Sequence, residues 1–224
     1  VIGRILEAEG LRVAIVPQPN WRDDLRDFRK LGRPRLFFGI SAGCMDSMVN
    51  KYTANKRLRS DDAYTPDGRP DMRPEYPSIV YTQILKKLYP DVPVVLGGIE
   101  ASMRRLSHYD YWQDRLKKSI LCESGADMLI YGMGEKPICE LVRRLTALCD
   151  NQDGVISSSD IHSPALSSIP QTAYLTRKYE SDENDITLYS HEECLADKKK
   201  QATNFRHIEE ESNKYAAARI VQAV

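Results

Sequence analysis

Two glycines and four polar side chains that could support chemistry follow an apolar run in the middle of the chain. The run at residues 94–96 indicates a strand buried on both faces, after which the glycines allow a tight turn. Two adjacent arginines cannot both follow one buried stripe, so at least one should reach solvent or an anionic ligand. An ion pair from the glutamate that only rigidifies the loop is the open alternative. The residues are Gly97, Gly98, Glu100, Ser102, Arg104 and Arg105.

A second glycine cluster lies between a predicted strand and a predicted amphipathic helix. It consists of Gly132, Gly134 and Glu135. Backbone amides and the helix dipole at such a turn favour an anion such as a phosphate. The motif alone favours the simpler alternative, a turn that needs glycine for a positive φ.

Aromatic residues gather just after the arginine pair, in the string HYDYW at residues 108–112. His108, Tyr109 and Asp110 begin it, and such tyrosine-rich and tryptophan-rich strings often mark a contact surface. The alternative is the start of a helix that packs on the sheet. The three-residue spacing from Ser107 to Asp110 resembles a capping box and predicts that helix, running to about residue 120.

The cysteines do not form a metal-binding pattern. The five cysteines include no C-x-x-C or C-x-x-x-C pair. His191 and Cys194 have the spacing of half a zinc site, but no second half has matching spacing. We therefore predict neither a metal ion nor a cysteine-bound iron–sulfur cluster in this chain.

The elements that would position these residues alternate between strand and helix over the first 150 residues. Strands are predicted at residues 13–16, 36–40, 94–96 and 128–131, and helices at 21–31, 77–88 and 138–148. This alternation predicts an α/β fold: an open, mainly parallel sheet with helices on both faces, as in flavodoxin-like and cobalamin-binding-like domains. Strand ends meet at one sheet edge, which would place Ser41, Gly43 and Asp46 beside Glu100, although these three residues taken alone favour a simple turn.

The rest of the chain has a different composition. Residues 151–171 are rich in Ser, Asp and Pro and indicate a linker after a domain at 1–150. Residues 172–224 would form a short strand at 172–176 and a helical tail. Ser190, with Glu193 three residues later, should cap a helix to about residue 211, followed by a helix at 215–224.

Charge and composition exclude several classes of partner. Thirty-two basic residues balance thirty-two acidic ones, so no net field favours nucleic acid or an anionic membrane. The sequence has no apolar run of the roughly 20 residues that span a bilayer. An odd number of scattered cysteines indicates a cytoplasmic location. The chain starts in what looks like the second half of a helix, so we expect a fragment of a longer protein.

Several strings together show a resemblance to a known family. They are LFFGISAG (36–43), MDSM (45–48), NKYTA (50–54), DDAYTP (61–66), GGIEAS (97–102), RR (104–105) and HYDYW (108–112). Over residues 1–148 the chain resembles the amino-terminal part of the YgiQ-type radical SAM proteins. Its tail from Ser190 onward is similar to that family's helical bridge into the catalytic domain.

The resemblance implies a parent enzyme in three parts. A domain shaped like the cobalamin-binding modules would precede a radical SAM barrel and a carboxyl-terminal extension. The barrel's C-x-x-x-C-x-x-C motif would hold a 4Fe-4S cluster that cleaves S-adenosylmethionine. The glycine turns at Gly97–Gly98 and Gly132–Gly134 are similar to the corresponding turns of cobalamin-binding modules.

Two departures from that pattern limit what this chain can do. The cluster motif is absent, and so is the first strand with the Asp-x-His-type motif that follows it in cobalamin modules. In the strand order 2-1-3-4-5 the missing strand is central. The sheet must then be completed in one of three ways: the neighbouring strands close up, a gap remains, or residues upstream of this sequence supply the strand. No histidine matches a lower axial ligand of cobalamin, and we expect no catalytic residue and no cofactor in this fragment.

Three functions remain open from the sequence. The leading one is an accessory domain that presents substrate or cofactor to a downstream radical SAM domain of the same chain. The second is a stand-alone flavodoxin-like module that binds a phosphate-bearing ligand through Gly132, Gly134 and the arginines. The third is a protein docking module that acts through the surface of Tyr109 to Trp112 and the tail.

Overall fold

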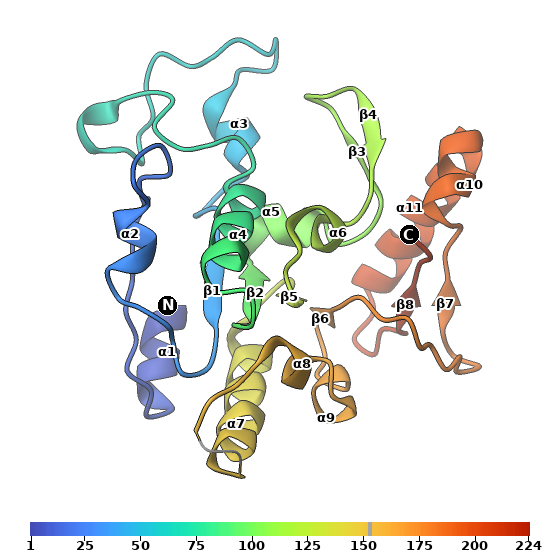
Figure 1. Cartoon of the computed structure of the whole chain (residues 1–224). Helices are drawn as coiled ribbons and strands as arrows, with labels where there is room; N and C mark the ends of the chain where they lie inside the picture. The colour runs from blue at the N-terminus through green and yellow to red at the C-terminus, as the bar shows by residue number, and fades with distance from the viewer. Residues whose placement is uncertain (152–153) are drawn as a thin grey trace.

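A four-stranded sheet forms the centre of the computed structural model, which describes residues 1–151 and 154–224 (Figure 1). Three strands run parallel and lie side by side in chain order, and the fourth runs antiparallel at one edge. The predicted α/β fold with a mainly parallel sheet is confirmed. The strand order is β1 (Phe38–Ser41), β2 (Val94–Gly97), β5 (Met128–Ile130) and β6 (Thr172–Ala173).

Helices cover both faces of the sheet because side chains of the central strand alternate between them. Val94 and Leu96 point into one core, with α4 (Pro77–Leu88) and α6 (Ile120–Ser124). Val95 points into the other core, with α7 (Glu135–Asn151) and α1 (Ile2–Ala8). Side chains at successive strand positions face opposite sides, so an uninterrupted apolar strand requires cover on both faces.

The amphipathic helix α7 follows its predicted pattern. Ile138, Leu141, Val142 and Leu145 are buried, and Leu148 packs partly buried against the same core. Val80, Ile84 and Leu88 form an apolar stripe on helix α4 but are only partly buried, because another side of the helix faces inward. That side carries Ser78, Tyr81, Thr82 and Leu85.

A long polar loop precedes α4. It contains one short 3-10 turn, η1 (Pro66–Gly68). The Arg73 guanidinium bonds the Asp62 carboxylate at 2.8 Å, and both side chains are largely buried. The loop is therefore attached to the domain by a shielded ion pair.

The strand predicted at residues 13–16 is wrong, and the following helix is shorter than predicted. Residues 11–20 form no regular element. The helix predicted over 21–31 reduces to α2 (Arg26–Arg29), because Leu25 takes a left-handed conformation with φ 61° that prevents helix before Arg26. No strand forms at 13–16, and the described strands β1 and β2 pair directly, so no gap separates them.

The helix predicted from Ser107 to residue 120 is also wrong, because the segment folds as a β-hairpin. Strands β3 (His108–Asp110) and β4 (Arg115–Lys117) pair antiparallel. The Asp110 carboxylate accepts the Gln113 backbone N–H at 2.8 Å, which closes the turn instead of capping a helix. Helix α6 begins only after its cap Ser119 and ends at Gly125, with φ 74°.

The segment predicted as a linker is packed on the sheet domain. It contains α8 (Ser158–Ile161) and α9 (Pro164–Ser167). Ile156, Ile161 and Leu166 are buried in the same core as α7. These isolated apolar residues thus anchor a largely polar segment to the sheet domain. The domain boundaries at 150 and 171 stay predictions.

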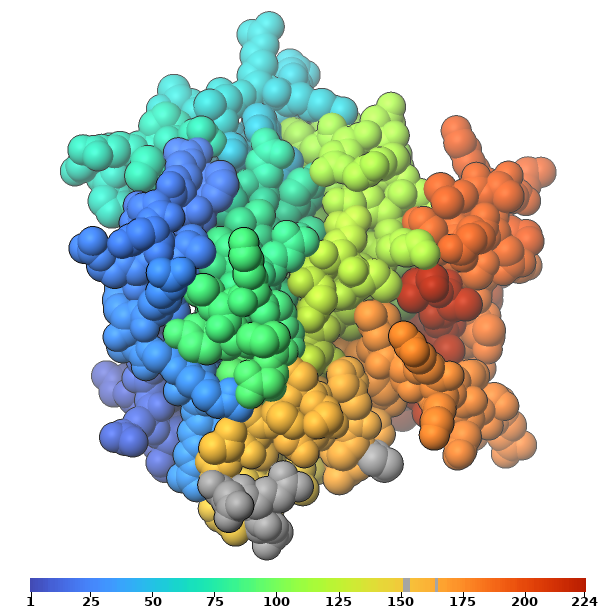
Figure 2. Space-filling view, viewed as in Figure 1, coloured from blue at the N-terminus to red at the C-terminus, as the bar shows by residue number. Residues whose placement is uncertain are grey.

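The tail forms a lobe beside the β3–β4 hairpin, orange to red in Figures 1 and 2. Ser190 and Glu193 form the predicted capping box at the start of α10 (His191–Ala196). Extended backbone at Asp197 interrupts the predicted long helix and caps α11 (Lys198–Ser212). The helix predicted at 215–224 is wrong: β8 (Ile220–Val221) instead pairs parallel with β7 (Ile186–Thr187).

Candidate functional site

The predicted polar cluster lies at the carboxyl edge of the sheet, where three strand ends meet. Ser41 ends β1 opposite Gly97 of β2. Gly98 has φ +82°, and a Cβ there would lie 2.6 Å from Ser41 Oγ, so only glycine fits. Ser102 Oγ accepts the Gly132 N–H at 3.2 Å and thereby joins the turn after β2 to the turn after β5.

Glu100 lies inside this edge with no exposed surface. It belongs to α5 (Gly98–Met103), which follows the glycine turn. Its two carboxylate oxygens accept the backbone N–H groups of Ser47 at 3.1 Å and Ser78 at 3.2 Å. These amides start α3 (Ser47–Lys51) and α4, so the carboxylate neutralises two helix starts at once. The Glu100 carboxylate therefore does not form the ion pair with Arg104 or Arg105 that the alternative interpretation required.

Arg104 and Asp46 form a buried ion pair, with side chains only 9% and 7% exposed. The Asp46 carboxylate also caps α3 by accepting the Met48 N–H at 3.0 Å. The guanidinium lies 5.4 Å from the ring centre of Tyr76. Burial opposes the charged guanidinium, but the hydrogen bond that it donates to Asp46 and the nearby negative charges of Asp46 and Glu100 together outweigh burial, and the pKa of Arg104 is raised. This arginine is a structural cation beneath the surface.

Arg105 differs from its neighbour because it stays partly exposed at the sheet edge. Its guanidinium donates to the Ser102 carbonyl at 2.8 Å and lies 4.8 Å from the ring centre of Tyr131. The expectation that at least one of the two arginines reaches solvent is confirmed. Of the pair, Arg105 is the one placed to meet an anion.

The hairpin divides the predicted aromatic string between its two faces. Asp110 is buried and accepts the Tyr76 hydroxyl at 2.6 Å. Burial opposes the charged carboxylate, yet hydrogen bonds led by Tyr76 leave the pKa of Asp110 lowered. Tyr109 is exposed and donates to Asp114. The His108 ring contacts the Leu106 carbonyl at 3.0 Å, and burial lowers its pKa.

The turn after β5 has the conformation that the simpler alternative predicted. Gly132 has φ +69°, and a Cβ there would lie 3.1 Å from the Gln171 amide nitrogen. Gly134 packs on Ile130, and Glu135 begins α7. Gly43, at the neighbouring strand end, is exposed with φ +107°. The anion-binding role of these glycines stays a prediction.

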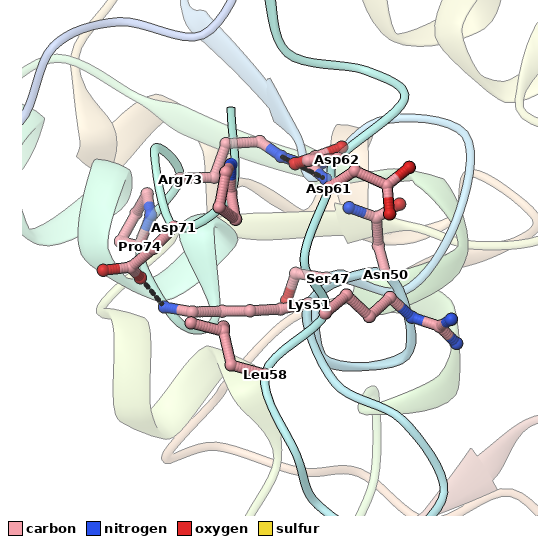
Figure 3. A pocket seen from close by; sticks show the side chains of 11 residues that line it. Ser47, Asn50, Lys51, Leu58, Asp61, Asp62, Asp71, Arg73 and Pro74 are labelled. Atoms are coloured by element: carbon pink, nitrogen blue, oxygen red, sulfur yellow. Dashed lines mark hydrogen bonds and ion pairs between the residues drawn. The ribbon is translucent and has the colours of Figure 1, made fainter. Parts of the chain in front are cut away.

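A small polar pocket lies under the long loop (Figure 3). Its volume of about 10 Å³ has room for a single water molecule. Four of its six charged lining residues form two ion pairs: Arg73 with Asp62 at 2.8 Å and Lys51 with Asp71 at 2.6 Å. Arg59 donates to the Val49 carbonyl at 3.3 Å, so most of these charges are satisfied within the chain.

A larger cavity of about 180 Å³ lies beside the hairpin, above the buried Arg104 and Asp110. Sequence reasoning found only Trp112 among its residues. Tyr52 and Tyr76, which flank the long polar loop, were the available signal, because such a loop rarely keeps aromatic side chains without a contact to make. The lining residues are Met48, Tyr52, Lys56, Glu75, Tyr76, Trp112 and Gln113.

The donor set does not fit the metal groups that the resemblance implies. Within residues 1–151 and 154–224, no three His, Cys, Asp or Glu side chains are grouped so that they could hold a metal ion. His191 Nδ1 lies 3.1 Å from Ser107 Oγ, and Cys194 Sγ lies 3.1 Å from the Asn204 amide nitrogen. Burial lowers the pKa of His191 and raises that of Cys194, as expected for packed side chains.

Comparisons with known proteins find relatives of this chain among the UPF0313 proteins. A UPF0313 protein of Bacteroides thetaiotaomicron is 77% identical over all of this chain and 36% of its own length. A UPF0313 protein of Porphyromonas gingivalis is 68% identical, with 100% and 34% covered. The UPF0313 protein YgiQ of Escherichia coli is 56% identical over 65% of this chain and 20% of its own length. No solved structure matches the chain.

The chain thus spans about a third of the length of the first two relatives. The family model described as Radical SAM N-terminal matches residues 1–224. That match covers the sheet, the hairpin and the tail together. The chain therefore belongs to the radical SAM N-terminal family.

Proposed function

We propose that this chain is the amino-terminal accessory domain of a longer radical SAM iron–sulfur enzyme. In this role its carboxyl sheet edge faces the downstream domain of the same protein and presents substrate or cofactor to it. The family match over the whole chain, together with coverage of only a third of the relatives, supports this role. The proposal includes a cytoplasmic location. No helix of the described residues has the length and apolar character to cross a membrane.

The chemistry of the proposed parent would come from elsewhere in the protein. A 4Fe-4S cluster needs thiolates that converge, and the five cysteines here lie apart on a loop and three helices. Two of the four histidines, His108 and His191, already contact the Leu106 carbonyl and the Ser107 hydroxyl, so neither of them is a free axial ligand for cobalamin. We derive no reaction step from this chain's residues.

One observation carries the proposed orientation of the sheet edge. Met103 on α5 is 62% exposed, and Met133 in the turn after β5 is 75% exposed. Ser102 precedes Met103, Gly132 precedes Met133, and a hydrogen bond joins Ser102 to Gly132. The two methionine side chains therefore flank one site. Exposed apolar groups around a strand-end edge are typical of a surface that another domain covers.

Methionine oxidation of the full-length protein tests this orientation. Hydrogen peroxide oxidises accessible thioethers, and peptide mass spectrometry reports the rate at each methionine. We expect Met103 and Met133 to react more slowly than Met72, which is 44% exposed in the long loop. If both react faster than Met72, as their exposure in this chain dictates, the downstream domain does not cover this edge.

The radical SAM assignment of the parent has its own test. We expect the full-length protein, reconstituted anaerobically with iron and sulfide, to show broad visible absorption that bleaches on reduction. It should then cleave S-adenosylmethionine. A colourless protein after reconstitution would refute the assignment, whatever the methionine result.

A further inference from the structure

The cavity of about 180 Å³ beside the hairpin has the size and walls of a ring-binding site. Three segments remote in sequence build it: the stretch from α3 to Lys56, the start of α4, and the β3–β4 turn. An apolar protein cavity of about 150 Å³ holds benzene. This cavity is open to solvent, so one heteroaromatic ring system fits in it and a substituent on the ring can extend outward.

Aromatic side chains form its walls. The Tyr52 and Trp112 ring centres lie 5.5 Å apart with planes tilted by 36°. Tyr111 packs edge-on against Trp112 at 5.3 Å and fixes the indole plane. Met48 adds a buried thioether to the lining. Flat, polarisable walls of this kind bind flat rings by stacking.

Cations already lie over the neighbouring rings. Lys117 and Arg104 lie 4.6 Å and 5.4 Å from the Tyr76 ring centre. Lys51 lies 5.8 Å from the Tyr52 ring centre, and Lys56 lies 4.7 Å from that of Tyr111. These cations already occupy the ring faces that an ammonium group would use, so the cavity favours a neutral ring over an ammonium group.

The rim supplies hydrogen-bond acceptors for the edge of such a ring. Glu75 Oε1 accepts the Tyr52 hydroxyl, and this bond to the carboxylate raises the pKa of Tyr52 to about 12. Among the described residues, no donor contacts Glu75 Oε2. The Gln113 side-chain amide lies on the same rim. Carboxylates and amides recognise the amino and N–H groups on base edges.

Two lining residues hold strained backbone. Tyr76 has φ 49° and Lys56 has φ 58°, a region that costs a non-glycine residue about 1–3 kcal/mol. The Tyr76 hydroxyl is fixed by Asp110 at 2.6 Å, and Lys56 Nζ by the Trp112 carbonyl at 3.3 Å. Such strain concentrates where a fold holds side chains in place for a ligand.

We propose that this cavity binds a neutral nucleobase with two adjacent N–H donors, of the guanine type, as a free nucleoside. The base stacks against Trp112 and places its donor edge on the Glu75 carboxylate. The balance of thirty-two basic and thirty-two acidic residues leaves no surplus charge for a polyanionic strand. This inference does not depend on the orientation of the carboxyl sheet edge.

Calorimetric titration of the full-length protein with guanosine tests the proposal. We expect saturable binding that weakens about tenfold or more with 1-methylguanosine, because one well-placed bidentate contact discriminates by about 1–3 kcal/mol. Glu75→Gln and Trp112→Leu should each weaken guanosine binding to a similar degree. Tyr109→Leu, on the exposed face of the same hairpin, should leave it unchanged.

Several outcomes would overturn the proposal. The proposal fails if guanosine does not bind, or if the wild-type protein and Glu75→Gln bind it equally well. Because Glu75 is half-exposed, its variant should keep the wild-type melting temperature and stay informative even if Trp112→Leu fails to fold. Binding of a guanosine-containing RNA oligonucleotide without binding of free guanosine would refute the free-nucleoside form.

Discussion

Ser107 Oγ lies 3.1 Å from Nδ1 of His191, and both residues are buried where the hairpin meets the tail. The Ser107 backbone N–H also donates to the Gln222 side chain at 2.9 Å, and its carbonyl accepts from Gln201 at 3.4 Å. One residue of the sheet domain therefore contacts α10, α11 and the strand segment at the end of the tail. This contact makes the tail part of the fold.

Replacing Ser107 by alanine should loosen the tail. The change leaves the His191 ring nitrogen buried without its partner, which costs about 1–3 kcal/mol. We expect that loss in the free energy of unfolding, measured by urea denaturation with intrinsic fluorescence. Ser60→Ala, in the exposed loop, is the matched control and should change stability by less than about 0.5 kcal/mol. Equal effects of the two variants would mean that Ser107 does not hold the tail.

Acidification should destabilise the protein below about pH 6.5 through the buried His191 and the partly buried His108. Burial lowers the pKa of His108 and His191 below their usual value of 6.5, so the unfolded state binds more protons than the folded state beneath that pH. Their contribution is fully present above pH 6.5 and is lost as the pH falls toward the lowered values. Urea denaturation between pH 7.5 and 5.5 measures it.

A double variant isolates the histidine contribution. His108→Gln with His191→Gln should flatten the dependence of unfolding free energy on pH in that range. His162 and His207 stay in place in both proteins, so the difference between the two curves isolates His108 and His191. An unchanged slope in the double variant would assign the pH dependence to other groups.

The two adjacent arginines should respond very differently to substitution. Arg104→Met leaves the Asp46 carboxylate buried without its cation, and we expect a loss of about 3 kcal/mol or more in unfolding free energy. Arg105→Met removes a partly exposed hydrogen bond and a ring contact, worth about 1 kcal/mol. Chemical denaturation of both variants measures the difference. Losses of equal size would contradict the buried ion pair.

A methyl group at Gly98 should strain the turn after β2. Gly98→Ala meets both the positive φ and Ser41 Oγ, and we expect a loss of about 2 kcal/mol in thermal or urea unfolding. Adding Ser41→Ala should recover part of it, because the steric clash disappears while the backbone strain remains. Gly39→Ala, whose Cβ would meet its nearest atom at 3.7 Å, is the control. Failure of Ser41→Ala to recover any stability would contradict the close approach of these two strand ends.

The sequence by itself determined the features that depend on neighbours along the chain. The apolar runs of β2 and β5, the stripe of α7 and the capping box at Ser190 are local patterns, and the structure confirms them. Local patterns suffice where burial on both faces or a cap leaves one conformation favourable. The family resemblance through its polar strings was likewise visible in the sequence and is confirmed by the match over the whole chain.

Only the tertiary structure decided which partner each polar side chain found. Glu100 accepts from amides 53 and 22 residues away, so the sequence could place it at a strand end but could not show that it caps two helices. The segment after Ser107 has the spacing of a capped helix, yet Asp110 is held by Tyr76 across the fold, and the chain forms a hairpin. Contacts between remote segments fix the burial of charged groups, and burial decides whether a carboxylate or guanidinium serves the fold or faces a ligand.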